Sequence, residues 1–150
     1  MTYSMIIADD DSLTCEMIRK YLLHTFPELD HIWIARDGTE AFSLYEQYYP
    51  DIILTDIAMP KCDGLELTEK LHQSGYTPKI IIISAHKNFA YAQNAVRLGV
   101  EDYISKPILP IQLKEIITKV IDSLNTSKQF LTNINDLLNK HKTNLPVLRE

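Results

Sequence analysis

Four short segments of the chain place acidic, hydroxyl and ammonium groups at the ends of apolar runs. Asp9-Asp10-Asp11 follows the first run, Asp56 ends the third, and Ser84 and Lys106 end the last two. Carboxylates gathered in one crevice repel each other unless a cation lies among them, and oxygen-only ligands favour a hard cation such as Mg²⁺. With an ammonium and a hydroxyl nearby, the set suits phosphoryl transfer to one carboxylate, with that aspartate as nucleophile.

The arrangement of these runs predicts how the four segments meet. Five apolar runs alternate with five amphipathic segments over the first 124 residues, which is typical of a parallel sheet with right-handed crossovers. We therefore predict a flavodoxin-like, doubly wound α/β fold with strand order 2-1-3-4-5, whose switch point lies between strands 1 and 3. The predicted strands are 5–8, 31–35, 52–56, 80–84 and 100–105, and the predicted helices start near Ser12, Gly38, Leu65, Phe89 and Pro110.

Composition limits the classes of function. The 150 residues are 45% hydrophobic with a net charge of −5, which fits one globular domain and argues against nucleic-acid binding by this segment. No apolar run is long enough to cross a bilayer, and the N-terminus does not resemble a signal peptide. Cys15 and Cys62 lack metal-ligand spacing, so we interpret both as reduced thiols. These features predict a cytoplasmic protein with no membrane contact.

A phosphate-binding flavin carrier and a set of unrelated structural roles are alternatives for the same residues. Flavin carriers share the predicted strand order, but they need a phosphate-binding loop after strand 1, and the acidic triplet would repel a phosphate. Taken alone, the triplet could cap a helix, Lys106 could be a solvated lysine, and Tyr103 could be a half-buried core aromatic. The joint placement of the triplet, Ser84 and Lys106 on the predicted sheet edge favours a shared functional site, but it does not decide the role of Tyr103.

The motifs at these four strand ends resemble a known family. Ala8–Asp11, Leu54–Pro60, Ile83–Ala85 and Ser105–Pro107 together resemble the receiver domain of bacterial two-component response regulators, over roughly residues 4–124. The stretches 90–92 and 95–103 are similar to receivers that carry an AraC-type DNA-binding output. The resemblance implies a signalling module rather than a dedicated enzyme.

The resemblance also implies roles for single residues. Asp56 would accept a phosphoryl group from a phosphohistidine of a sensor histidine kinase. Asp10, Asp56 and the backbone carbonyl of Ala58 would bind Mg²⁺, with Asp9 acting through a water molecule. Lys106 would pair with the phosphoryl group. Ser84 and Tyr103 would act as the switch. Ser84 would move to hydrogen-bond the phosphoryl group, and Tyr103 would follow by changing rotamer. We expect the switched face to form a homodimer on phosphorylation.

A phosphatase of the haloacid dehalogenase type is the competing enzyme class. It also uses an aspartate nucleophile with Mg²⁺, a hydroxyl and a lysine, but its nucleophile lies on strand 1 in an Asp-x-Asp-x-Thr/Val pattern. Leu13 breaks that pattern after Asp9, and Asp56 would have no task. The two classes differ in which aspartate carries the phosphoryl group.

Residues 125–150 are expected to form a helical linker or tail after a receiver at 1–124, with no output domain in this chain. Asn125-Thr126-Ser127 is a poor helix interior, so two alternatives stay open. Either the last helix continues, or a second helix starts near Ser127. Residues spaced as in a coiled-coil seam favour a helix in both cases: Ile117, Val120, Leu124, Ser127, Leu131, Ile134, Leu138 and His141.

Overall fold

A computed structural model describes residues 1–85 and 89–144 of the chain. Its elements follow the order β1 (Tyr3–Ala8), α1 (Ser12–Thr25), β2 (Leu29–Ala35), α2 (Gly38–Tyr48), β3 (Ile52–Asp56), α3 (Gly64–Gln73), β4 (Lys79–Ser84), α4 (Phe89–Arg97), β5 (Asp102–Ser105) and α5 (Pro110–Asn144). The chain divides into two compact units, Met1–Ile116 and Ile117–Glu150.

The first unit contains one parallel sheet in the order β2-β1-β3-β4-β5, as the sequence predicted. The register pairs Ala8 with Thr55 and Asp56 with Ile83, so the ends of β1, β3 and β4 meet at one edge. Ligands of such sheets bind outside the carboxyl ends of the strands at the switch point. The fold therefore brings the three predicted strand ends to the same place.

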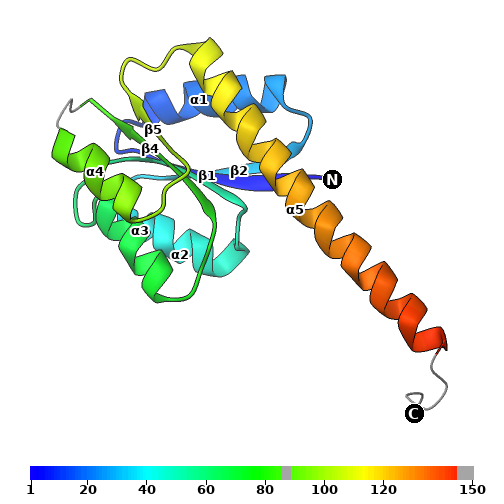
Figure 1. Cartoon of the computed structure of the whole chain (residues 1–150). Coiled ribbons are helices and arrows are strands. Elements are labelled where there is room, and N and C mark those ends of the chain that lie inside the picture. Colours follow the sequence, from blue (N-terminus) through cyan, green and yellow to red (C-terminus); the bar gives the residue numbers. More distant parts are fainter. Residues whose placement is uncertain (86–88, 145–150) are drawn as a thin grey trace. The chain divides into compact units, whose positions relative to one another are not determined.

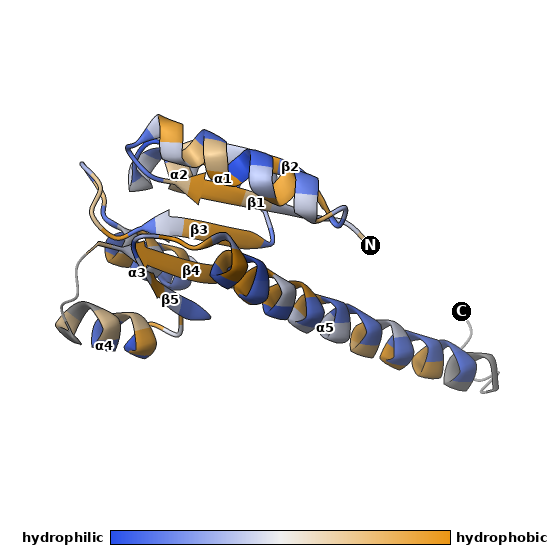
Figure 2. Ribbon diagram, turned by 90° about the horizontal axis from the view of Figure 1, so that it is seen from above, coloured by the Kyte–Doolittle hydropathy of each residue, from blue (hydrophilic) through white to orange (hydrophobic). Residues whose placement is uncertain are grey.

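Helices cover both faces of the sheet. Figure 1 shows α1 on one side and α2, α3 and α4 on the other. The central strands β1, β3 and β4 are mostly apolar and almost entirely buried, which is typical of parallel strands covered on both faces (Figure 2). On the α2–α4 side, the side chains of alternate strand residues pack with Ala41, Leu67, Leu71 and Ala95 from the helices.

Local capping signals explain where the helices begin. Aspartate side chains accept hydrogen bonds from the first-turn amides of α1, α2 and α3, at Asp11, Asp37 and Asp63. At α3 the Asp63 carboxylate accepts from the amide of Glu66, and the Glu66 carboxylate accepts from the amide of Asp63, a reciprocal capping box. Each of these caps follows the end of a strand, which fixes where the loops near the site turn.

Several element boundaries differ from the sequence prediction. The second strand starts at Leu29 rather than residue 31, and the fifth starts at Asp102 rather than residue 100. The apolar residues of α1 are not all buried, because Leu13 and Met17 are 69% and 65% exposed. Among the alternatives for the tail, the structure has α5 as one continuous helix to Asn144.

Candidate functional site

The three consecutive aspartates after β1 have different surroundings. Asp11 caps α1: its carboxylate accepts hydrogen bonds from the amides of Leu13 and Thr14, at 3.1 and 3.3 Å, and from the Thr14 hydroxyl at 2.8 Å. These bonds lower the pKa of Asp11. The bond from the Thr14 hydroxyl has the largest effect, followed by the bond from the Thr14 amide. Asp11 therefore has a structural task in starting α1.

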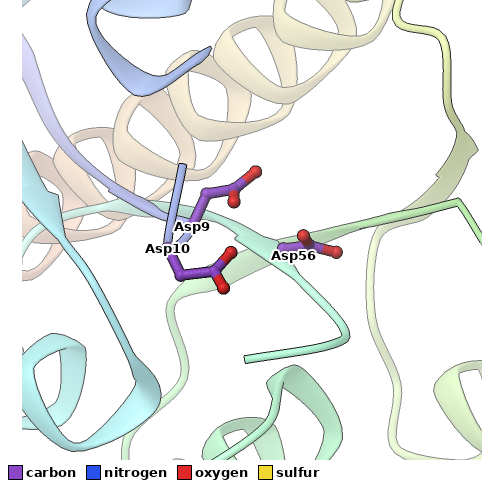
Figure 3. Close-up of side chains that lie close together, drawn as sticks. All are labelled: Asp9, Asp10 and Asp56. Carbon is purple, nitrogen blue, oxygen red and sulfur yellow. The ribbon is translucent and has the colours of Figure 1, made fainter. Parts of the chain in front are cut away.

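Asp9, Asp10 and Asp56 form an acidic cluster. One carboxylate oxygen of each lies within 4.8 Å of the others, and Figure 3 shows the three side chains gathered at the ends of β1 and β3. Asp9 and Asp56 are only 4% and 7% exposed, whereas Asp10 is open to solvent. The backbone amide of Asp11 donates to Asp9 at 3.0 Å, which fixes one oxygen of that carboxylate. The cluster thus has a buried floor and one accessible carboxylate.

Lys106 supplies positive charge to this floor. Its Nζ atom lies 2.9 Å from Asp56 Oδ2 and 3.2 Å from Asp9 Oδ2. Burial alone would lower the pKa of Lys106, but the hydrogen bond to Asp56 and the charges of Asp56 and Asp9 outweigh it, so the pKa is raised. Lys106 is therefore an ammonium cation that contacts Asp56 directly. The Lys106–Pro107 peptide bond that follows is cis.

Ser84 and Tyr103 lie on the neighbouring strands. Ser84 is fully buried and comes one residue after Ile83, the register partner of Asp56, and its carbonyl accepts from the amide of Lys106 at 2.8 Å. Tyr103 pairs with Ile82 in the register of β4 and β5 and is half-buried against the core beneath α2–α4. The fold places Ser84 at the same edge of the sheet as Asp56. Tyr103 lies two residues before the end of β5.

The loop after Asp56 is held tightly against the start of α3. The Gly64 amide donates to the Ile57 carbonyl at 3.0 Å, and a Cβ atom on Gly64 would lie 2.5 Å from the Asp56 carbonyl oxygen. The Ala58 amide approaches Asp56 Oδ1 at 3.4 Å, and Ala58 itself is exposed. From the sequence, Asp63-Gly64 indicates only a turn. The cap signal Asp63-x-x-Glu66 could have located the start of α3, but not the close approach to Asp56.

An apolar groove borders the acidic cluster. It has a volume of about 540 Å³ and lies between α1 and the segment that joins β5 to α5. Met17, Ile18 and Tyr21 line one wall and Pro107 and Ile108 the other, and Asp11 and Lys106 are its charged lining residues. The Tyr21 hydroxyl donates to the carbonyl of Pro110 at 3.1 Å, which ties the two walls together. The exposure of Met17 is explained by this groove.

The donors of the cluster fit a hard divalent cation. All three side chains offer carboxylate oxygens, without a nitrogen or sulfur ligand, and this is the donor set of Mg²⁺ rather than of zinc. The exposed Asp10 allows a hydrated ion to keep several of its water molecules, as Mg²⁺ usually does. Lys106 already offsets part of the charge of Asp9 and Asp56, so the cluster needs one further cation rather than two.

Both cysteines lie close to the site. The Cys15 thiol is buried and approaches the carbonyl of Asp9 at 3.5 Å, and burial together with nearby carboxylates raises its pKa to about 12. Cys62, in the loop before α3, is half-buried, and burial raises its pKa as well. Neither thiol is activated as a nucleophile, so the reactive groups of this region are the carboxylates.

Comparison with known proteins agrees with this fold and site. Residues 5–118 match the family model described as the response regulator receiver domain. The chain is 32% identical over 123 residues to an uncharacterized response regulatory protein of Vibrio cholerae, covering 82% of this chain and 46% of that protein. It is 29% identical over 122 residues to the transcriptional regulatory protein HptR of Staphylococcus aureus, covering 81% and 48%.

A solved structure shows the same architecture. The receiver domain of AraT, a response regulator from Geobacillus stearothermophilus, is 33% identical with a TM-score of 0.78, and the match covers 85% of this chain and 99% of that one. The sheet of order 2-1-3-4-5 with an acidic cluster at its switch point is a flavodoxin-like α/β domain, and the family match makes it a regulatory one. The chain belongs to the response regulator receiver domain family.

The matched relatives are longer than this chain. The chain spans about half the length of the curated relatives that it matches. No helix among residues 1–85 and 89–144 is long and apolar enough to cross a membrane.

Proposed function

We propose that Asp56 is the phosphoacceptor of this receiver domain, and that its phosphoryl donor is a phosphohistidine of a sensor histidine kinase. The observation that carries the proposal is the direct contact of Lys106 with the Asp56 carboxylate at 2.9 Å, at the floor of an acidic cluster with an open side. An ammonium group in this place can neutralise charge on a phosphoryl group attached to Asp56.

In the proposed reaction a carboxylate oxygen of Asp56 attacks phosphorus while the bond from phosphorus to the donor nitrogen breaks. Lys106 then exchanges its contact with the free carboxylate for one with a phosphoryl oxygen. Mg²⁺ bound at Asp10, Asp56 and the backbone carbonyl of Ala58, with Asp9 acting through water, would neutralise the remaining charge. The buried position of Asp9 behind Lys106 suits an indirect role for its carboxylate.

The switch belongs to the same proposal. A phosphoryl group adds about two negative charges and strong hydrogen-bond acceptors. The Ser84 hydroxyl would move to donate to one phosphoryl oxygen, and Tyr103 would take a new rotamer. Tyr103 is half-buried and packs against the core beneath α4, so its movement would alter the face formed by α4 and β5. That face would form the homodimer on phosphorylation, and we infer that the dimer controls a transcriptional output, of AraC type, in a cytoplasmic pathway.

The apolar groove between α1 and the β5–α5 segment is the proposed docking surface for the kinase. Lys106, which contacts Asp56, lines this groove, so a helix seated in it would bring a phosphohistidine close to Asp56. Met17, which lines the groove, is largely exposed, and Leu13 on the same helix adds further exposed apolar area. A partner placed there buries surface that is otherwise exposed to water.

Stoichiometry distinguishes this proposal from a phosphatase. With acetyl phosphate and Mg²⁺, a receiver takes up one phosphoryl group per chain and returns it slowly to water. We expect intact-mass measurements to show one added phosphoryl group in the wild type and none in Asp56→Asn. Rapid multiple-turnover hydrolysis of p-nitrophenyl phosphate, retained in Asp56→Asn, would instead support the phosphatase.

A further inference from the structure

The C-terminal part of α5 carries an exposed apolar stripe. Five large apolar side chains, called the tail stripe here, are between 36% and 67% exposed: Phe130, Leu131, Ile134, Leu137 and Leu138. All five lie in the second compact unit of the chain. Figure 2 shows apolar and polar residues alternating along this part of the helix. The proposed phosphoacceptor function does not use this surface.

The spacing of the tail stripe is that of a coiled-coil heptad. Leu124, Leu131 and Leu138 recur every seven residues and occupy position a, and Ile134 occupies position d with Ser127 one heptad earlier. Phe130 and Leu137 occupy position g, so the apolar face is wider than a two-position seam. A face of this width is suited to packing against another helix.

The composition of the same segment makes an isolated helix unfavourable. Nine of the twenty residues from 125 to 144 are Asn, Thr or Ser, which are poor helix formers: Asn125, Thr126, Ser127, Thr132, Asn133, Asn135, Asn139, Thr143 and Asn144. Most helical stability in proteins comes from packing an apolar face rather than from propensity. A helix of this composition therefore depends on a partner that covers the stripe.

We propose that the tail stripe is a self-association surface, and that the tail of a second copy of this chain packs on it as a two-stranded coiled coil. A second copy presents the same heptads, so leucines meet at every a layer, and Ser127 meets Ser127 at one d layer. A polar layer of this kind weakens pairing but fixes its register. The proposal needs no phosphorylation of Asp56, so it stands or falls separately from the proposed function.

Charge favours a second copy over a charged partner helix. In a parallel pair each g residue contacts the following e residue of the other helix, which joins Ser123 to Lys128 and Phe130 to Asn135. Neither pair joins like charges, and Asp122 and Asp136 lie at the outward position f. Because Lys128 is the one charged residue at the e and g positions of 123–138, the flanks offer little charge by which to select another partner.

The stripe is small, which sets the expected affinity. Residues 130–138 span about 13 Å of helix, and stable specific interfaces bury about 1,200–2,000 Å² in total. Two such stripes provide less than this, so we expect a weak dimer that forms reversibly and depends on concentration. Changes of one side chain in the seam should then shift the equilibrium measurably in either direction.

Sedimentation equilibrium of the full chain, unphosphorylated and without Mg²⁺, tests the proposal with two matched pairs of variants. Leu131→Asp places a charge in the seam, and Thr132→Asp places the same charge on the outer face one residue later. We expect the first to weaken dimerisation at least tenfold and the second to leave it unchanged. Ser127→Leu should strengthen dimerisation about tenfold, whereas Gln129→Leu at outward position f should not.

Three results would overturn the proposal. One is a wild-type chain that stays monomeric at every concentration and remains so with Ser127→Leu. Another is equal dimerisation of Leu131→Asp and Thr132→Asp, which would place the interface elsewhere. The third is an equal gain from Ser127→Leu and Gln129→Leu. Because Ser127→Leu is a gain-of-association variant, loss of folding cannot imitate its expected result.

Discussion

Removing one carboxylate from the acidic cluster should stabilise the ion-free protein. The oxygens of Asp9, Asp10 and Asp56 lie within 4.8 Å of one another, and Lys106 pairs with Asp9 and Asp56. At that separation two unit charges repel by about 0.9 kcal/mol in water and about 3.5 kcal/mol at an effective dielectric constant of 20. Because Asp10 is exposed, we expect the lower end, so Asp10→Asn should raise the free energy of unfolding by about 1 kcal/mol.

The same substitution should remove about half or more of the stabilisation by Mg²⁺. A ligand that binds only the folded state stabilises it by about 2.7 kcal/mol at 100 times its dissociation constant. If Asp10→Asn weakens binding tenfold or more, this gain falls to about 1.4 kcal/mol or less at the same Mg²⁺ concentration. Urea denaturation measures the free energy of unfolding of the wild type and of the variant, each with and without Mg²⁺. The wild type should then be stabilised by Mg²⁺ much more than the variant.

Asp11→Asn is the matched control, because it removes a neighbouring carboxylate that caps α1 instead of joining the cluster. An asparagine can still cap the helix, so the response to Mg²⁺ should stay that of the wild type. The electrostatic reasoning would be refuted by an Asp10→Asn variant that is less stable without Mg²⁺ yet keeps the full Mg²⁺ response, or by an Asp11→Asn variant that loses it.

The packing around the cluster supports three more predictions. Gly64→Ala should lower the free energy of unfolding by about 1–3 kcal/mol and slow phosphorylation by acetyl phosphate, because the new Cβ would displace the Asp56 backbone. A variant with normal stability and a normal phosphorylation rate would contradict the close approach of Gly64 to Asp56. Ser84→Ala should keep the Mg²⁺-dependent stabilisation and slow only phosphorylation, so a lost Mg²⁺ response in the denaturation assay would make Ser84 part of the ion site. Thiol titration at pH 8 should label Cys62 in the folded protein and Cys15 only after unfolding, because Cys15 is buried and its pKa is raised to about 12; early labelling of Cys15 would refute that burial.

The strand order was predictable from the sequence because it depends on short-range signals. Apolar runs broken by Pro50, Pro78 and acidic or glycine turns mark the parallel strands, and their count limits the topology. The same signals placed Asp56 and the acidic triplet at one edge, where the structure has them together. The roles assigned to these residues came from the family resemblance and remain predictions.

Other features depend on long-range packing, which one sequence does not reveal. Charge alone could not separate Asp11, a helix cap, from Asp10, a member of the cluster. Helical spacing could not separate Met17, which lines an open groove, from Ile18 and Leu22, which are buried on the same helix. The role of Gly64 arises from the nearby backbone of Asp56, eight positions earlier, and no local pattern records that contact.

The identity of the phosphorylated residue is the most direct test of the central claim. The protein is incubated with acetyl phosphate and Mg²⁺, the acyl phosphate is trapped by reduction, and the modified residue is located by peptide mass spectrometry. The contact of Lys106 with the Asp56 carboxylate predicts modification of Asp56 alone, and the proposed Mg²⁺ site at the acidic cluster predicts no modification when Mg²⁺ is chelated. Modification of Asp9 in place of Asp56 would contradict the account and favour the phosphatase mechanism.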